Sequence, residues 1–216
     1  NFGNPARPEI MWQFVEAVEG LADACRALDI PITGGNVSLY NETDGQAIYP
    51  TPIIGVVGLV EDASRVVSRT FKQAGDEVVL LGDGYGELGG SEYLKTMLGL
   101  VQGQPPELDL DKEHSLIVLL NQAASAGLLQ SAHDCSDGGV AIALAECAFD
   151  TGGVGFAVDL PPSTSPVATL FGESASRAVV SVTTSNLQTL LELAASLGVP
   201  ARSIGRTGGS NITMAI

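Results

Sequence analysis

Short apolar runs alternate with longer segments of helical periodicity along residues 77–216, and this alternation constrains the fold more than any other feature. A short apolar run between turn formers is typical of a buried strand, whereas recurrence at three- and four-residue spacing indicates a helix. The predicted strands lie at 77–82, 154–159, 177–183, near 200–206 and near 211–216. The predicted helices lie at 91–99, 111–126, 138–149 and 185–197. This order predicts an α/β or α+β domain in which helices cover a sheet.

The N-terminal part, residues 1–62, is expected to contain one long helix and two short strands. Pro8 suits the first helical turn, where its missing N–H is not needed, and Pro31 helps to end the helix. The apolar stripe of this helix consists of Ile10, Met11, Phe14, Val15, Val18, Leu21, Ala22, Cys25 and Leu28. Strands are predicted at 30–33 and 53–60, with a loop at 44–52. A piece this short cannot enclose a sizeable core, so its stripe is expected to pack either on the second domain or on a part of a longer protein outside this sequence.

These patterns divide the chain into residues 1–62, a charged linker at 63–74, and a complete-looking domain at 75–216. A hydrophobic content of 45% is ample for a buried core. Ser91 is expected to cap a helix, and Gly127 and Gly198 fall where helices are expected to end. The stretch Pro-Pro-Ser-Thr-Ser-Pro at 161–166 predicts a loop.

Charge and cysteine content exclude several classes of protein. The net charge of −15 opposes a nucleic-acid partner, because the phosphate backbone requires a basic surface, and it also disfavours an anionic membrane surface. No apolar run approaches the ~18 residues of a membrane span. Cys25, Cys135 and Cys147 show no metal-ligand spacing and predict no disulfide framework, which fits a reducing cytoplasm.

The segment 34–43, Gly-Gly-Asn-Val-Ser-Leu-Tyr-Asn-Glu-Thr, is the first candidate site. Glycines let a phosphate or a metal approach the main chain, and Asn36 and Glu42 offer the oxygen ligands that Mg²⁺ takes. In an extended stretch, alternate side chains such as those of Asn36 and Ser38 face the same way. A tight turn built from turn-forming residues is the alternative interpretation.

A second glycine pattern, Gly84-Tyr85-Gly86-Glu87-Leu88-Gly89, matches the dinucleotide fingerprint in letter. We reject this interpretation because the acidic residues that follow come after Pro105-Pro106 rather than at the end of a second strand, where ribose recognition needs them.

The third candidate is the segment 133–139, His-Asp-Cys-Ser-Asp-Gly-Gly, just before a predicted helix. One interpretation is an anion or ligand site at the helix N-terminus, formed by His133, Asp134, Ser136, Asp137, Gly138 and Gly139. The alternative is simple capping of the helix by Ser136 or Asp137. A catalytic triad has little support, because a triad is assembled from separated segments. Cys135 is expected to be a buried hydrophobe rather than a nucleophile.

Gly34–Thr43 resembles a motif of the phosphoribosylformylglycinamidine synthases, ligases of purine biosynthesis. Three further stretches fit the same family in the same order, namely Asn1–Pro5, Ala47–Pro52 and His133–Gly139. The resemblance spans nearly the whole chain and is to the small-subunit type. It implies the end of an aminoimidazole ribonucleotide synthetase N-terminal-like domain, followed by a complete C-terminal-like α/β domain with a mixed sheet.

The resemblance also implies roles for three residues. Gly35 corresponds to a backbone contact with ATP, Asn36 to a Mg²⁺ ligand, and Ser38 to a contact with formylglycinamide ribonucleotide. The implied partners are a glutaminase subunit that supplies ammonia and a small third subunit. No catalytic residue of the family falls within this chain, so the chain is expected to be part of a longer ligase and to be inactive alone.

Two other functions stay open. One is another ATP-using enzyme of the same superfamily, although the 34–42 motif is not expected there. The other is a non-catalytic domain that binds nucleotide structurally or docks partner subunits.

Overall fold

The computed structural model describes residues 1–60 and 62–216, so residue 61 of the predicted first piece lies outside the described residues. The chain divides into two compact units, Asn1–Glu61 and Asp62–Ile216. Each unit is described by itself. No helix in the described part of the chain combines the length and apolar character that crossing a membrane requires.

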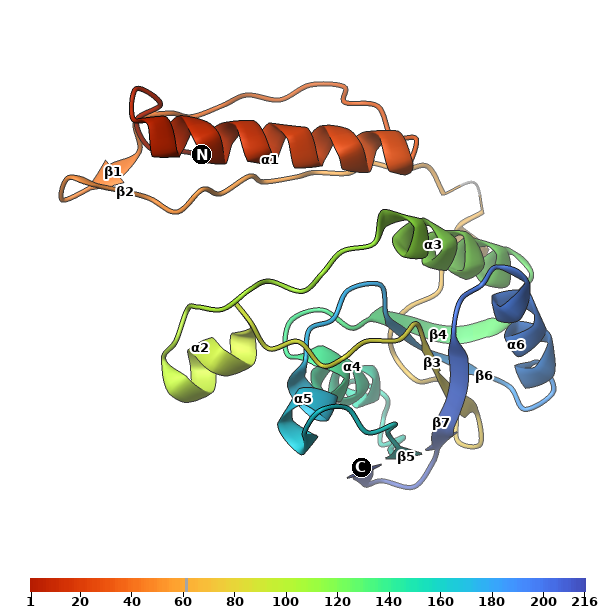
Figure 1. The fold of residues 1–216 in the computed structure, drawn as a ribbon. Coiled ribbons are helices and arrows are strands. Elements are labelled where there is room, and N and C mark those ends of the chain that lie inside the picture. Colours follow the sequence, from red (N-terminus) through yellow and green to blue (C-terminus); the bar gives the residue numbers. More distant parts are fainter. Residues whose placement is uncertain (61) are drawn as a thin grey trace. The chain divides into compact units, whose positions relative to one another are not determined.

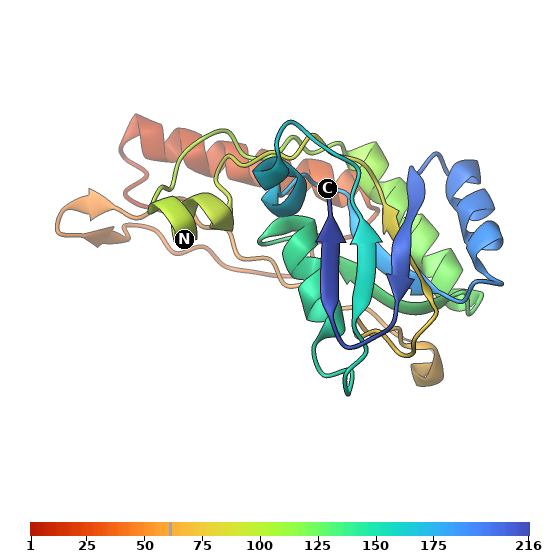
Figure 2. The ribbon, with the colours of Figure 1, turned by 90° about the horizontal axis from the view of Figure 1, so that it is seen from below.

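The second unit is built on one six-stranded mixed sheet (Figure 1). Its strands are β3 (Glu77–Leu81), β4 (Leu129–Asp134), β5 (Phe156–Asp159), β6 (Ala178–Val182), β7 (Ala201–Thr207) and β8 (Ile212–Ala215), in the spatial order β4-β6-β3-β7-β5-β8. All neighbours pair antiparallel except β5 and β8, which run parallel. Figure 2 shows this parallel pair as the teal and dark blue arrows, with β7 pointing the other way beside β5.

Helices cover both faces of this sheet, with α4 (Gly139–Ala148) on one face and α3 (Leu110–Ser125) and α6 (Leu187–Ser196) on the other. The unit also contains the short helices α2 (Glu92–Leu98) and α5 (Pro166–Phe171), and α5 packs on α4. Successive residues of a strand point to opposite faces, and accordingly Val179 of β6 joins a core cluster with α4, whereas Val180 joins a second cluster with α3 and α6. Aliphatic side chains make up most of both clusters, and Leu144 and Leu190 are fully buried in them.

The sequence-based elements of the second unit are confirmed to within two or three residues, but two were missed. Strand β4 was not predicted because its sequence, Leu-Gln-Ser-Ala-His-Asp, contains a polar residue on the buried face. Ser131 is tolerated there because its hydroxyl lies 2.6 Å from that of Ser181 on β6. Helix α5 has only six residues and begins at Pro166, within the predicted loop, with Ser165 as its cap.

Residues 63–74, expected to be a linker, contain one turn of 3₁₀ helix, η1 (Ala63–Arg65), and belong to the second unit. Phe71 is buried in the cluster with α4, and its N–H donates to the carbonyl of Cys147 over 2.8 Å. Arg65 donates to the carbonyl of Ser125 at the end of α3.

The first unit contains α1 (Pro8–Ala27) and the two-residue strands β1 (Glu42–Thr43) and β2 (Gln46–Ala47). Helix α1 begins at Pro8, as predicted. The strands predicted at 30–33 and 53–60 are wrong, since both stretches are irregular and exposed. A strand requires a neighbour for its N–H and C=O groups, and no described residues of this unit supply one to either stretch.

Candidate functional site

The segment 34–42 is held against the start of the chain by backbone hydrogen bonds. The N–H of Phe2 donates to the carbonyl of Ser38 over 3.0 Å, and the N–H groups of Tyr40 and Asn41 donate back to Gly3 and Phe2. The carboxamide of Asn41 adds a bond to the carbonyl of Phe2. Two stretches that the sequence singled out separately therefore form one local structure.

The three residues with implied roles lie on the open side of this structure. Gly35, Asn36 and Ser38 are all exposed, and a Cβ added at Gly35 would meet nothing within 4 Å. A ligand can therefore reach the main chain at Gly35. The hydroxyl of Ser38 bonds with the carboxamide of Asn41, which fixes its position.

The oxygen donors of the segment fit part of a magnesium site. Asn36 offers an exposed carboxamide, whereas the carboxylate of Glu42 is paired with Arg7 at 3.4 Å. Mg²⁺ is commonly held by one or two protein oxygens together with phosphates and waters. Asn36 can serve as one such ligand. Among the described residues no group of three His, Cys, Asp or Glu side chains forms a metal cluster.

The segment 133–139 joins the end of β4 to the start of α4. His133 lies between two carboxylates, with Nδ1 at 2.9 Å from Asp134 and Nε2 at 2.7 Å from Glu146 of α4. The Ser136 hydroxyl donates to the other oxygen of Asp134. This bond is the main reason why the pKa of Asp134 lies below its usual value. The segment is thus an internally bonded cluster.

The expectation that Ser136 or Asp137 caps α4 is wrong. The N-cap is Gly138, in a left-handed conformation at φ 77°, and no side chain of its own segment caps the helix. Instead, Oε1 of Glu173 accepts the N–H of Gly138 at 2.8 Å. The same oxygen accepts the N–H of Glu92, the first residue of α2, at 2.9 Å. The Glu173 carboxylate therefore supplies the negative charge that the partly positive N-terminus of α4 favours.

Cys135 is buried, as predicted, and burial raises the pKa of its thiol to about 12. Because the thiolate is the reactive form, a thiol with this pKa is inert near neutral pH.

The glycine pattern at 84–89 allows close packing of the chain. A Cβ on Gly89 would overlap the backbone of Gln104, and one on Gly86 would overlap that of Ala168. Asp109, one of the acidic residues that follow the pattern, accepts the N–H groups of Asp111 and Lys112 as the cap of α3, so its carboxylate is bonded within the chain. These contacts agree with our rejection of the dinucleotide interpretation.

Sequence patterns missed two residues that organise this unit, Glu173 and Arg177. Glu173 lies in a polar stretch after a predicted loop, and Arg177 is the first residue of a predicted strand, with no motif to mark either. Arg177 is buried and donates from Nε to the carbonyl of Ser174 and from Nη2 to that of Gly172. Only the folded chain reveals that these two side chains face inward.

Family models match both units of the chain. The AIR synthase related protein C-terminal domain matches residues 73–215, and the AIR synthase related protein N-terminal domain matches residues 1–60. The chain belongs to the AIR synthase related protein family.

Individual relatives define the likeness further. The chain is 48% identical over 216 residues to the phosphoribosylformylglycinamidine synthase subunit PurL of Moorella thermoacetica, covering 100% of this chain and 29% of that protein. It is 51% identical over 215 residues to the subunit of the same name from Thermobifida fusca, covering 99% of this chain and 28% of that protein. The chain thus spans less than a third of the length of these relatives, and the resemblance inferred from the sequence motifs is confirmed.

Solved structures share the fold. Thermotoga maritima PurL complexed with FGAR superposes with a TM-score of 0.69 at 22% identity, over 89% of this chain and 33% of that one. The structure of PurLQS from Thermotoga maritima gives a TM-score of 0.67 at 19% identity, over 91% of this chain and 32% of that one. At these identities the likeness supports the fold alone, and the predicted fold class is confirmed.

Proposed function

We propose that the chain is part of an ATP-dependent ligase that converts formylglycinamide ribonucleotide and ammonia to formylglycinamidine ribonucleotide in purine biosynthesis. The observation that supports this most strongly is the 48% identity, along the whole chain, to a phosphoribosylformylglycinamidine synthase subunit. Because the chain spans 29% of that relative, the activity belongs to the longer protein. The chain alone is proposed to be inactive.

The chemistry makes a poor leaving group into a good one. The amide oxygen of the substrate takes the γ-phosphoryl group of ATP, which releases ADP and leaves an iminophosphate. Ammonia then attacks the former amide carbon of this intermediate, and inorganic phosphate departs with the oxygen. Such a reaction depends on holding its partners in line and on stabilising the developing charge.

Within this proposal, three residues of the first unit hold ligands. The backbone at Gly35 contacts ATP, the exposed carboxamide of Asn36 binds Mg²⁺, and the Ser38 hydroxyl contacts the ribonucleotide. The metal would neutralise phosphate charge when bound. The exposure of all three residues and the open space at Gly35 support these assignments. For segment 133–139, the proposal of an anion site gains no support from its internal bonding.

The wider assignments are also part of the proposal. They comprise the division at 1–62, 63–74 and 75–216, a cytoplasmic location, a glutaminase partner that supplies ammonia, and a small third subunit. The net charge of −15 opposes a nucleic-acid partner.

Calorimetric titration of Mg·ATP into the chain tests the assignment of Asn36. We expect binding that requires Mg²⁺ and is lost in Asn36→Ala, because the carboxamide oxygen is removed. Asn121→Ala, on an exposed position of α3, is the matched control and should bind like the parent. Metal-independent binding, or equal binding by Asn36→Ala, would contradict the assignment. Turnover of substrate by the chain alone would contradict the proposed inactivity.

A further inference from the structure

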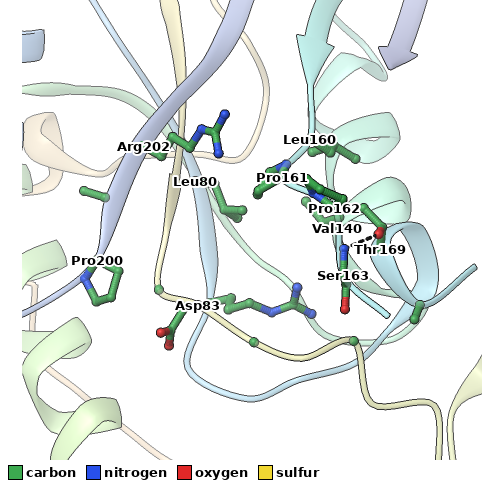
Figure 3. A pocket seen from close by; sticks show the side chains of 16 residues that line it. Leu80, Asp83, Val140, Leu160, Pro161, Pro162, Ser163, Thr169, Pro200 and Arg202 are labelled. Atoms are coloured by element: carbon green, nitrogen blue, oxygen red, sulfur yellow. Dashed lines mark hydrogen bonds between the residues drawn. The ribbon is translucent and has the colours of Figure 1, made fainter. Parts of the chain in front are cut away.

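A cavity of about 270 Å³ lies in the second unit, between the glycine-rich loop 82–86 and strand β7 (Figure 3). Leu80 and Val140 form part of its apolar lining, together with Leu160, Pro161, Pro162 and Ala168. Arg202 enters from β7 on one side, and Ser163 and Thr169 lie on the other. The cavity is of the size that suits a small ligand.

The lining charges of this cavity are mainly positive. Arg177 and Arg202 are its two cations and Asp83 is its one anion, in a chain whose net charge is −15. Asp83 is exposed and lies 3.6 Å from Lys112, which offsets its charge. A local excess of positive charge in so acidic a protein favours an anionic ligand.

Arg177 is the strongest indication of a ligand. Its side chain is 92% buried, since its exposed fraction is 8%. Among the described residues no carboxylate lies within ion-pair distance of it or of Arg202. Nε and Nη2 each donate to a backbone carbonyl, whereas Nη1 has no acceptor among the described residues and is not fully buried, so a ligand can reach it. A buried guanidinium normally has a paired anion.

The glycines of the loop 82–86 allow it to pack closely enough to form one wall of the cavity. A Cβ on Gly82 would overlap the carbonyl of Ser176, and a Cβ on Gly84 would overlap the side chain of Ser174. A Cβ on Gly86 would overlap Ser163 and Ala168. Three glycines at alternating positions thus bring the loop against the segments that contain Arg177 and Ser163, which explains a pattern that dinucleotide binding does not.

We infer that this cavity binds a small phosphate-bearing ligand, with the phosphate between Arg177 and Arg202 and an apolar portion against Leu160 and Pro161. A planar guanidinium matches two oxygens of a phosphate or a carboxylate at once, and two arginines suit the double charge of a phosphate better than the single charge of a carboxylate. This inference concerns the second unit only and does not rest on the proposed function. Arg177 also borders a neighbouring cavity beside His133, so Arg202 is the residue that distinguishes the two.

Titration with inorganic phosphate at constant ionic strength, followed by amide chemical shifts in the full chain, tests the inference. We expect saturable shifts at Gly84, Ser163 and Arg202. Arg202→Gln should weaken binding about tenfold, because one charge-assisted hydrogen bond is lost. Arg26→Gln is the matched control, since Arg26 is an exposed arginine of α1 paired with Asp23, and it should leave binding unchanged.

A variant of opposite sign separates a binding role from a structural one. Asp83→Asn removes the one anion of the cavity and should tighten phosphate binding about two- to threefold. The absence of saturable shifts in the parent would overturn the inference, as would equal affinity in Arg202→Gln and Arg26→Gln. Acetate binding as tightly as phosphate would overturn the phosphate assignment and indicate a carboxylate ligand instead.

Discussion

The two units of this chain have similar apolar content, but the second unit buries large apolar side chains in a core whereas the first unit leaves many of them exposed. In the second unit, a sheet of six strands buries aliphatic side chains on both faces. In the first unit Phe2 and Ile10 are the buried large side chains among the described residues, while Val57 is 98% exposed and Leu59 is 89% exposed. The comparison teaches that an apolar run becomes core only where paired strands provide a surface to cover it.

The largest difference between the units should appear in a pair of leucine truncations. Leu144→Ala removes a fully buried side chain of α4 and should lower the free energy of unfolding by about 2–5 kcal/mol. Leu59→Ala makes the same change at an exposed position and should alter it by less than about 0.5 kcal/mol. Urea unfolding followed by circular dichroism measures both. Equal losses would show that Leu59 is buried in solution and would break the comparison.

A pair of glycine substitutions should show a smaller difference. Gly82 and Gly45 both have a positive φ, at 80° and 75°, so alanine is strained at each. At Gly82 a Cβ would also overlap the carbonyl of Ser176, whereas at Gly45 it would meet nothing within 4 Å. Gly82→Ala should cost about 2–3 kcal/mol and Gly45→Ala about 1 kcal/mol. Matching thermal midpoints of the two variants would contradict this.

Removing a carboxylate sharpens the comparison further. Glu173→Ala leaves the N–H groups of Glu92 and Gly138 without their acceptor and should cost about 2 kcal/mol. Glu42→Ala removes a partly exposed ion pair of the first unit and should cost less than about 1 kcal/mol. Chemical denaturation of the two variants side by side is the measurement, and a costlier Glu42→Ala would reverse the expected order.

The smallest expected effect is a pH dependence at Asp134. Its pKa is lowered, mainly by the hydrogen bond from Ser136, so it stabilises the fold above its usual pKa of 3.8. This contribution is lost as the pH falls below that value and through the lowered pKa of the folded state. In Ser136→Ala the Asp134 pKa should rise, which a carboxyl-carbon NMR titration would detect. Ser38→Ala, in the first unit, should leave the Asp134 titration unchanged.

Sequence patterns predicted the strands and helix ends of the second unit better than the strands of the first unit. Local signals were sufficient in the second unit, where Gly127 and Gly198 take left-handed conformations just after helices end and Ser91 caps α2, as predicted. Strand β4 was missed because its buried Ser131 depends on a hydroxyl 50 residues away. The apolar run at 53–60 was wrongly predicted to be a strand, because a strand requires a hydrogen-bonded neighbour. The pattern of one segment does not show whether such a neighbour is present.

The candidate site residues likewise divide into those that the sequence marks and those that only the structure reveals. Residue types marked the segments 34–42 and 133–139, because glycines and polar side chains cluster there in sequence. They could not mark Glu173 or Arg177, whose importance comes from the segments that fold around them. A single chain shows clusters along the sequence, whereas a pocket is assembled across it.

The shared oxygen of Glu173 also has a consequence for motion. One oxygen accepts both the first N–H of α2 and the N-cap N–H of α4, so a movement of the Glu173 side chain breaks both hydrogen bonds and releases both helix starts together. Amide hydrogen exchange at Glu92 and Gly138 should therefore follow one opening event, with equal opening free energies at two sites 46 residues apart in the chain.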